Sequence, residues 1–353
     1  MYYPQGKYCW YLVLSTLSIP VQGTVSTESV TWRDGAGVHG PCPKLEEEKA
    51  VFKLHRSCVF TFLILLIIGL AQGGVITDPT DAFSVGIGPD GSLYDAGAGV
   101  GFLRIADGYD PLAPGSPRDS WGIYGVGVGS AFADPEDFGT SGVSSTSTFS
   151  ANTASFVSTS TNGYTVAQSY VFADANILAI VTTVTNAGST TQDTVFQRDI
   201  DWDVAPTEFN ENSFGPAVSG NVIDSTSDGF QNPDPSAPYG SSCATGCNNT
   251  GDNGGGIKID LGTLAPGQST TFTYLYGISQ TGENVNGLIA QVNALGAYYD
   301  IATQSSDGGA FPLLGTNSAI IAVAESPEPE TFGFIGMGLA LIGLRVVRKR
   351  NRD

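Results

Sequence analysis

Hydrophobic and polar residues alternate with a period of two through the middle of the chain. Between residues 149 and 280 several apolar runs show this alternation, and turn sequences such as Asn186-Ala187-Gly188 and Pro266-Gly267 separate them. Short period-two runs divided by turns are typical of strands in an antiparallel β-sandwich. The runs are marked by Tyr164, Val166, Tyr170 and Phe172, by Ile177–Val181, by Thr194–Val204, by Ile257, Ile259 and Leu261, and by Phe272, Tyr274, Tyr276 and Ile278. The pattern predicts an all-β fold, an antiparallel β-sandwich with Gly-rich loops.

Two other segments depart from this alternation. Leu288, Val292 and Leu295 recur at helical spacing, which predicts one helix over Asn286–Leu295. Residues 74 to about 145 are rich in glycine and show no sustained alternation, so we expect irregular structure there. Gly86, Gly88 and Gly91 formally match a dinucleotide-binding fingerprint, but Pro89-Asp90-Gly91 is a turn with no amphipathic helix after it. Nucleotide binding is therefore not expected.

The charge of the chain narrows the function classes. Among 353 residues, 34 are acidic and 15 are basic, for a net charge of −19. Such a chain repels a phosphate backbone, which excludes nucleic acid as a partner. His39 and His55 both lie upstream of residue 74, so the region 74–325 has no histidine for a catalytic triad, a zinc site or a haem. That region also lacks a Gly-x-Ser-x-Gly elbow, and we expect no enzyme.

A secretory signal lies inside the chain. Lys53 and Arg56 precede the apolar run Val59–Leu70, and Ala71-Gln72-Gly73 follows with small residues at the −3 and −1 positions of a cleavage site. A basic region, a short apolar region and a small-x-small site together predict a signal peptide over residues 51–73. The run is shorter than the roughly 20 residues that span a bilayer.

Residues 1–50 precede this signal and have no clear periodicity. Two interpretations stay open. Either the true start is Val51, read from an alternative start codon, or residues 1–50 form a genuine extended leader. A peptide spanning Glu46–Lys53 in the nascent precursor would exclude the later start.

The end of the chain has three parts in a fixed order. Pro327, Glu328 and Pro329 lead into the uncharged run Phe332–Leu344, and a basic tail follows. The tail contains Arg345, Arg348, Lys349, Arg350 and Arg352. This arrangement, over residues 326–353, resembles the PEP-CTERM sorting signal. The resemblance implies export through the secretion translocon and processing by a membrane protease of the exosortase type. It also implies a Gram-negative bacterium that makes exopolysaccharide. A plain C-terminal membrane anchor is the alternative.

Basic residues at both extremities predict the orientation of the chain. Lysines and arginines that flank an apolar segment tend to stay cytoplasmic, so both ends are held inside and residues 74–325 lie outside as one exported β-sandwich domain. Thirteen residues form about 20 Å of helix against a hydrocarbon core of about 30 Å, so the C-terminal transmembrane helix is a marginal span. We expect a membrane-anchored precursor that then reaches the cell surface or the extracellular matrix.

Cys243 and Cys247 lie in a loop rich in Gly, Asn, Ser and Pro, over residues 231–256. In an exported protein, two cysteines this close in sequence predict a local disulfide. A CxxxC pair without further soft ligands is a poor zinc site.

The most distinctive acidic run is Arg198–Phe209. If Phe196, Ile200, Trp202 and Val204 face the core, then Asp199, Asp201 and Asp203 line the other face of the strand, about 6.6 Å apart. A covered row of this kind needs a cation, and calcium is the candidate cofactor, although the run is no EF-hand because Val204 and Asn210 replace the glycine and the glutamate. The alternatives are a solvated edge, a structural row that bonds loop backbone, and a catalytic carboxylate pair.

These observations predict an exported structural or adhesive protein of the surface or matrix. The alternative function is a carbohydrate-binding or carbohydrate-active module that uses the Asp199/Asp201/Asp203 face with Trp121 and Tyr239, and takes exopolysaccharide as its partner.

Overall fold

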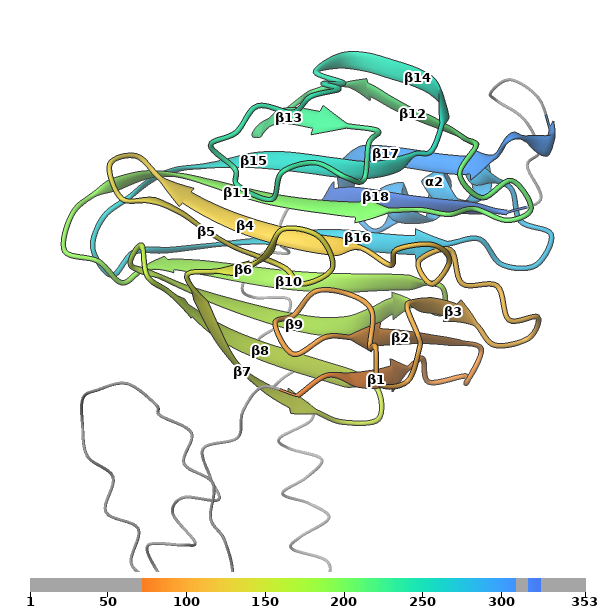
Figure 1. Ribbon diagram of the computed structural model, residues 1–353, viewed down its shortest axis with the longest axis horizontal. Helices are drawn as coiled ribbons and strands as arrows, with labels where there is room; N and C mark the ends of the chain where they lie inside the picture. The colour runs from red at the N-terminus through yellow and green to blue at the C-terminus, as the bar shows by residue number, and fades with distance from the viewer. Residues whose placement is uncertain (1–71, 309–316, 325–353) are drawn as a thin grey trace, which may run out of the picture. The chain divides into compact units, whose positions relative to one another are not determined.

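The computed structural model describes residues 72–308 and 317–324, and within them the chain forms three antiparallel sheets (Figure 1). The nine-stranded sheet runs in the order β14 (Thr245–Gly251), β12 (Glu211–Ala217), β17 (Ala297–Ser305), β18 (Ser318–Ala324), β16 (Ser269–Ile278), β10 (Ile177–Asn186), β9 (Tyr164–Asp174), β8 (Thr153–Ser160) and β7 (Val143–Phe149). The six-stranded sheet runs β13 (Val222–Thr226), β15 (Gly254–Leu264), β11 (Gln192–Asp201), β4 (Asp119–Gly125), β5 (Gly129–Asp134) and β6 (Gly139–Ser141). The small sheet runs β1 (Gly74–Thr77), β2 (Phe83–Ile87) and β3 (Phe102–Arg104).

The two large sheets pack face to face around one aromatic core. Phe196 of β11 meets Phe272 of β16 with ring centroids 5.2 Å apart, and Trp202 meets Tyr276 at 6.2 Å. The small sheet joins the same core, since Phe102 of β3 packs edge-on against Phe172 of β9. The described residues thus confirm the predicted all-β antiparallel sandwich.

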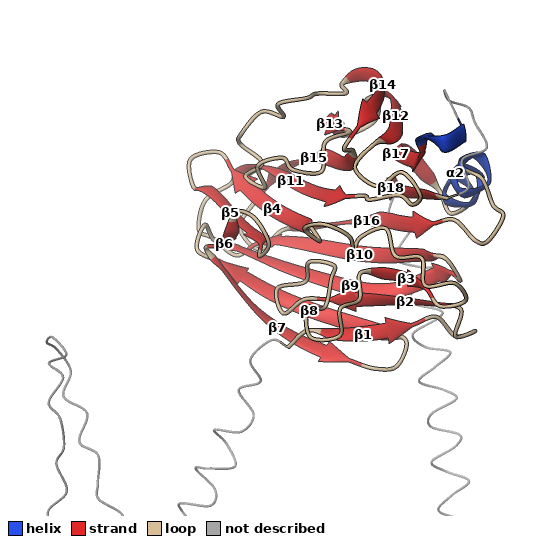
Figure 2. Ribbon diagram, turned by 45° about the vertical axis from the view of Figure 1, so that its right-hand side comes forward, coloured by secondary structure: helices blue, strands red, loops and turns tan. Residues whose placement is uncertain are grey.

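One helix, α2 (Val285–Ala294), covers part of the outer face of the nine-stranded sheet (Figure 2). Its buried Val285, Leu288 and Val292 form a second apolar cluster with side chains of β10, β16, β17 and β18. The Asn284 side chain accepts a hydrogen bond from the Gly287 amide and caps the first turn. The helix predicted over Asn286–Leu295 is confirmed within one residue at each end. A 3₁₀ turn, Ser306–Gly308, follows β17.

The expectation of irregular structure from residue 74 to about 145 is wrong, because β1 to β6 lie there. The glycines that interrupt the alternation permit close approaches between backbones. A Cβ on Gly86 would lie 2.0 Å from the Val100 carbonyl oxygen, and one on Gly122 would lie 2.0 Å from that of Pro233. Glycine at these positions removes the side chains whose period would have revealed the strands.

Much of the predicted signal peptide (residues 51–71) and the whole sorting signal (326–353) lie outside the described residues. Within the described ranges, no helix has the length and apolar character needed to cross a membrane.

Candidate metal centre

Strand β11 is central in its sheet and is buried on both faces. It pairs with β15 on one side and with β4 on the other. Phe196, Ile200 and Trp202 face the core, as predicted, and are fully buried. Asp199 and Asp201 occupy the opposite face, yet they are only 0% and 3% exposed. A solvated edge is therefore the wrong interpretation of this acidic run.

The loop between β13 and β14 covers the acidic face. The Gln197 amide donates to the Asn232 carbonyl oxygen at 2.8 Å. Lys258, on the neighbouring strand β15, donates to the Ala237 carbonyl oxygen and lies 4.2 Å from the centre of the Tyr239 ring. Cys243, at the end of this loop, is joined by a disulfide to Cys247 of β14, with the two Cα atoms 5.0 Å apart. The loop removes the aspartates of β11 from water.

Three consecutive glycines of β15 make room for the aspartates. Gly254, Gly255 and Gly256 pair with Asp201, Ile200 and Asp199, respectively. A Cβ on Gly256 would lie 2.1 Å from Oδ1 of Asp199, and one on Gly254 would lie 2.1 Å from the Ile200 carbonyl oxygen. The Gly254–Gly256 run therefore marks the site in the sequence, although the alternation of apolar and polar residues does not identify it.

Asp199 belongs to a separate hydrogen-bonded group. Its carboxylate accepts from the Gln197 amide, and the Tyr239 hydroxyl lies beside it. Burial raises the pKa of Asp199 to about 7, against the smaller opposing effects of these hydrogen bonds and of Arg118 and Lys258. The Gln197 amide therefore serves Oδ2 of this carboxylate, whereas Oδ1 has no hydrogen-bond partner among the described residues.

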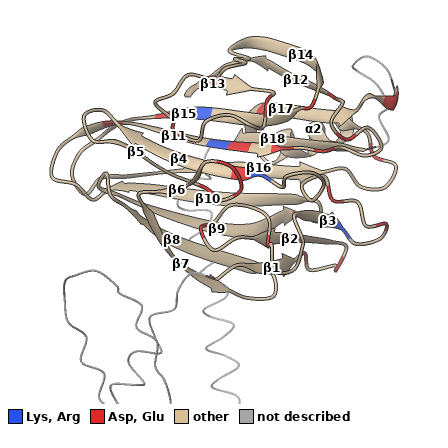
Figure 3. Ribbon diagram, viewed as in Figure 1, with Lys and Arg blue, Asp and Glu red and all other residues tan. Residues whose placement is uncertain are grey.

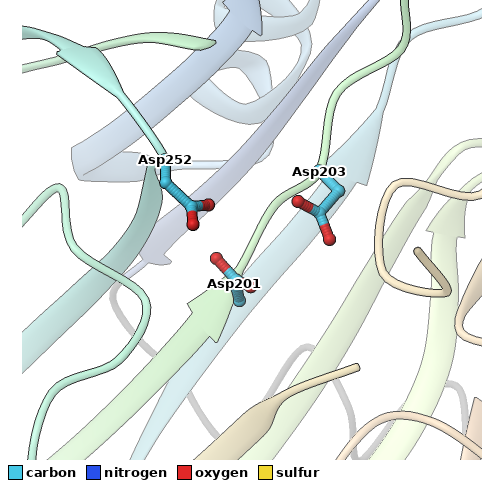
Figure 4. Close-up of side chains that lie close together, drawn as sticks. All are labelled: Asp201, Asp203 and Asp252. Atoms are coloured by element: carbon cyan, nitrogen blue, oxygen red, sulfur yellow. The ribbon is translucent and has the colours of Figure 1, made fainter. Parts of the chain in front are cut away.

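Asp201 and Asp203 instead meet Asp252, which lies between β14 and β15 (Figure 4). One carboxylate oxygen from each of the three lies within 4.8 Å of the others, and the side chains point toward one another. Asp203 is 2% exposed, whereas Asp252 is exposed to solvent. Among the described residues, Oδ1 of Asp201 and Oδ1 of Asp203 have no hydrogen-bond partner. A buried carboxylate oxygen without a donor is costly, so both oxygens lack the partner that burial demands.

Backbone contacts fix the positions of these acids. The Asp201 amide donates to the Arg118 carbonyl oxygen at 2.9 Å, and the Asp203 amide donates to that of Pro111 at 2.7 Å. Glu211 anchors the segment that carries Asp252, because its carboxylate accepts from the amides of Val204 and Asn253, each at 3.2 Å. The cluster therefore joins the end of β11 to the β14–β15 turn.

Burial and mutual repulsion raise the pKa values in the cluster. Burial is the largest cause at Asp201, whose pKa rises to about 8, and Asp203, Asp252 and Glu211 raise it further. The pKa values of Asp203 and of Glu211 rise to about 7 for the same reasons. Arg118, which opposes the rise at Asp201, is itself bound to Asp134 at 2.7 Å. The local charge is thus not balanced by a free base.

The donor set suits a hard divalent cation. Carboxylate oxygens bind calcium at 2.3–2.6 Å, so ligands of one ion lie up to about 5 Å apart, and the three oxygens of the cluster meet that limit. The sequence predicted Asp199, Asp201 and Asp203 as the set. The structure gathers Asp201 and Asp203 and adds Asp252, while Asp199 lies with Gln197 and Tyr239. Asp252 lies in the run Gly251-Asp252-Asn253-Gly254. Its Gly, Asp and Asn residues are the sequence feature that could have indicated a ligand-bearing turn there.

The aromatic residues suggested for a sugar site are not at the surface. Trp121 is fully buried in the core and stacks on Phe196, and Tyr239 is 6% exposed beneath Lys258. Neither ring offers a face on which a sugar could stack, so this part of the carbohydrate hypothesis is wrong.

Comparison with known proteins adds little. No family model and no curated protein matches the chain. Among solved structures, a galactose mutarotase-like protein from Lactobacillus casei is similar at 13% identity over 72% of this chain and 91% of its own. The TM-score is 0.34, too low to carry an argument.

The raised pKa values predict how stability depends on pH without divalent cations. The Asp201 carboxyl has a pKa of about 8 in the folded protein and of 3.8 in the unfolded chain. Because the folded state therefore binds the proton more tightly, stability is lost as the pH rises between these two values. We expect the free energy of unfolding, measured with urea in EDTA, to fall from about pH 5 to about pH 8. Asp201→Asn should flatten this slope, and the exposed control Asp260→Asn should not. A stability that increases over this range would contradict the geometry.

The glycine run predicts a steric effect. Gly256→Ala places a methyl group against the Asp199 carboxylate in the centre of a sheet, so we expect a loss of about 1–3 kcal/mol in unfolding free energy. Gly240→Ala is the matched control, because a Cβ there meets Gln231 no closer than 3.6 Å. Chemical denaturation of both variants measures the difference, and equal stabilities would show that Gly256 is not required.

Proposed function

We propose that the chain is an exported structural β-sandwich of the cell surface or polysaccharide matrix, whose fold a divalent cation completes. The observation that carries the proposal is that Asp201 and Asp203 each have a buried oxygen without a partner and that their carboxylates gather with that of Asp252. Calcium suits this role, because three carboxylates in a partly exposed cluster resemble the ligand sets of extracellular modules, which bind it at about 10⁻⁴–10⁻³ M.

The cation holds separate segments together in this proposal. Asp201 and Asp203 follow one another at the end of β11, and Asp252 comes from the β14–β15 turn about fifty residues later. An ion between them closes that end of the six-stranded sheet and neutralises charges that otherwise repel. Because Asp201 and Asp203 are almost fully buried, the ion serves the fold, and only the Asp252 side opens to solvent.

The disulfide supports the exported location. Structural disulfides persist in oxidising compartments and are rare in the cytosol. Cys243–Cys247 closes the loop region that also covers the acidic face, so oxidation and cation binding act on the same part of the fold. The signal peptide and the Pro327–Pro329 sorting motif supply the route that we propose, through the translocon and an exosortase-type protease.

The burial of the aspartates restricts where a carbohydrate could bind in the alternative function. Asp199, Asp201 and Asp203 are buried, so an exopolysaccharide would reach the site only from the solvent side of the ion, at Asp252. Saturable, calcium-dependent retention on the host exopolysaccharide that Asp252→Asn removes would favour this alternative.

Calcium binding is tested by thermal unfolding and titration calorimetry. We expect calcium to raise the Tm of the EDTA-treated protein, and the Tm should keep rising with the logarithm of calcium concentration above the Kd, because calcium binds the folded state alone. Asp201→Asn should abolish this rise without lowering the Tm in EDTA, since an uncharged amide of similar size replaces a carboxyl whose ionised form burial disfavours. Asp260→Asn, an exposed change on β15, should keep the full response. A protein whose Tm ignores calcium, or an Asp201→Asn variant that still responds, would overturn the cation proposal.

Export is tested through the oxidation state of the cysteines. In an exporting host, acid quenching and alkylation should find Cys243 and Cys247 oxidised. Deletion of the apolar run Val59–Leu70 should retain the chain in the cytosol with both thiols free. If Cys243 and Cys247 of the chain that keeps this run are reduced, the exported location is wrong, whatever the result with calcium.

A further inference from the structure

Strand β7 is an open edge of the nine-stranded sheet. It pairs with β8 alone, and no other backbone-to-backbone hydrogen bond of the described chain reaches it. Figures 1 and 2 show it along the border of the sheet. The Ser147 hydroxyl exchanges hydrogen bonds with the Gln72 backbone, at 3.0 and 3.1 Å, which engages one side chain and leaves the strand edge itself open.

Within the described part of the chain, this edge strand has no charge, proline or bulge that would keep another strand away. Natural edge strands are protected by charges, prolines, bulges or covering segments. β7 is seven residues long, contains no proline and pairs with β8 in unbroken register. No Lys, Arg, Asp or Glu occurs from Phe138 to Ala173, and β7 and β8 are uncharged in Figure 3. In a chain of net charge −19, this border is where a second acidic molecule meets no charge of its own sign and is not repelled.

The sequence of β7, Val-Ser-Ser-Thr-Ser-Thr-Phe, is chemically symmetric about Thr146. If two copies pair antiparallel on a two-fold axis at this residue, Ser144 meets Thr148 and Ser145 meets Ser147. The apolar ends, Val143 and Phe149, then meet each other. Hydroxyl pairs of this kind already join β7 to β8, as in Thr148–Ser155 and Ser145–Ser158, each at 2.7 Å.

We propose that β7 is a self-association edge, at which a second copy of this chain adds its own β7 and continues the nine-stranded sheet. The occupant is a second copy because every cross-strand pair matches in chemistry, as an isologous two-fold interface requires. Backbone hydrogen bonds supply the affinity, as in other cases of strand addition. The site lies away from Asp201 and does not depend on the cation.

The test uses the full chain purified from an exporting host, with its mass measured by light scattering over a concentration series. We expect a concentration-dependent dimer. The double variant Ser144→Lys/Thr148→Lys places like charges opposite one another and should weaken dimerisation at least about tenfold. The matched variant Ser144→Lys/Thr148→Glu places opposite charges in the same positions and should keep the dimer.

Two further measurements make the outcome decisive. Equal amounts of the Lys/Lys variant and of Ser144→Glu/Thr148→Glu should form a heterodimer. Thr271→Lys, an exposed change on β16, should not affect association, because three strands separate β16 from β7; thermal unfolding shows whether each variant is folded. The proposal is overturned if the wild type stays monomeric at its highest soluble concentration or if the Lys/Lys variant dimerises as the wild type does. A monomer whose β7 amides resist hydrogen exchange would equally overturn it, because another segment would then occupy the edge.

Discussion

The buried ion pair between Arg198 and Asp119 holds the two large sheets in their relation to one another. Both side chains are fully buried, and they are directly bonded. Arg198 also donates to the Tyr276 hydroxyl at 3.0 Å and to the Gln168 side chain at 2.6 Å, and both acceptors belong to the nine-stranded sheet. Such a pair is tolerated only when hydrogen bonds satisfy its remaining atoms, so the packing of both sheets must preserve this geometry.

The opposite face of β11 shows what happens when no base is left. The described chain has four bases, and each is engaged: Arg104 with Asp107, Arg118 with Asp134, Arg198 with Asp119, and Lys258 with the Ala237 carbonyl oxygen. The acids of the Asp201 cluster therefore have no protein cation to meet. Their charge is balanced either by protons, which the raised pKa values express, or by a metal ion. One face of β11 thus neutralises its buried charge with an ion pair, and the other face does so with protons or a metal ion.

The sequence was informative where one face of an element packs on a core. The runs at Tyr164–Phe172 and Phe272–Ile278 and the helix near Leu288 were found because burial imposes a period on them. The strands before residue 145 were missed because backbone contacts there require glycine, which carries no hydropathic signal. In the site, the alternation of side chains along an extended strand placed Asp201 and Asp203 on one face. It could not show that Asp252 closes the cluster or that Asp199 turns to Tyr239, because these contacts depend on how a distant hairpin and loop fold over β11.

Charged and uncharged residues occupy different parts of this fold. Several buried charges, including Asp119, Arg198, Asp201 and Lys258, lie on β4, β11 and β15, where burial makes each of them require an opposite charge, a proton or a hydrogen bond. From Phe138 to Ala173 the chain has none, and hydroxyls that bond across strands replace them. A charged interior face demands an ion or an ion pair, because solvent cannot reach it. An uncharged edge makes no such demand, and it leaves a row of backbone donors and acceptors that only another strand can match.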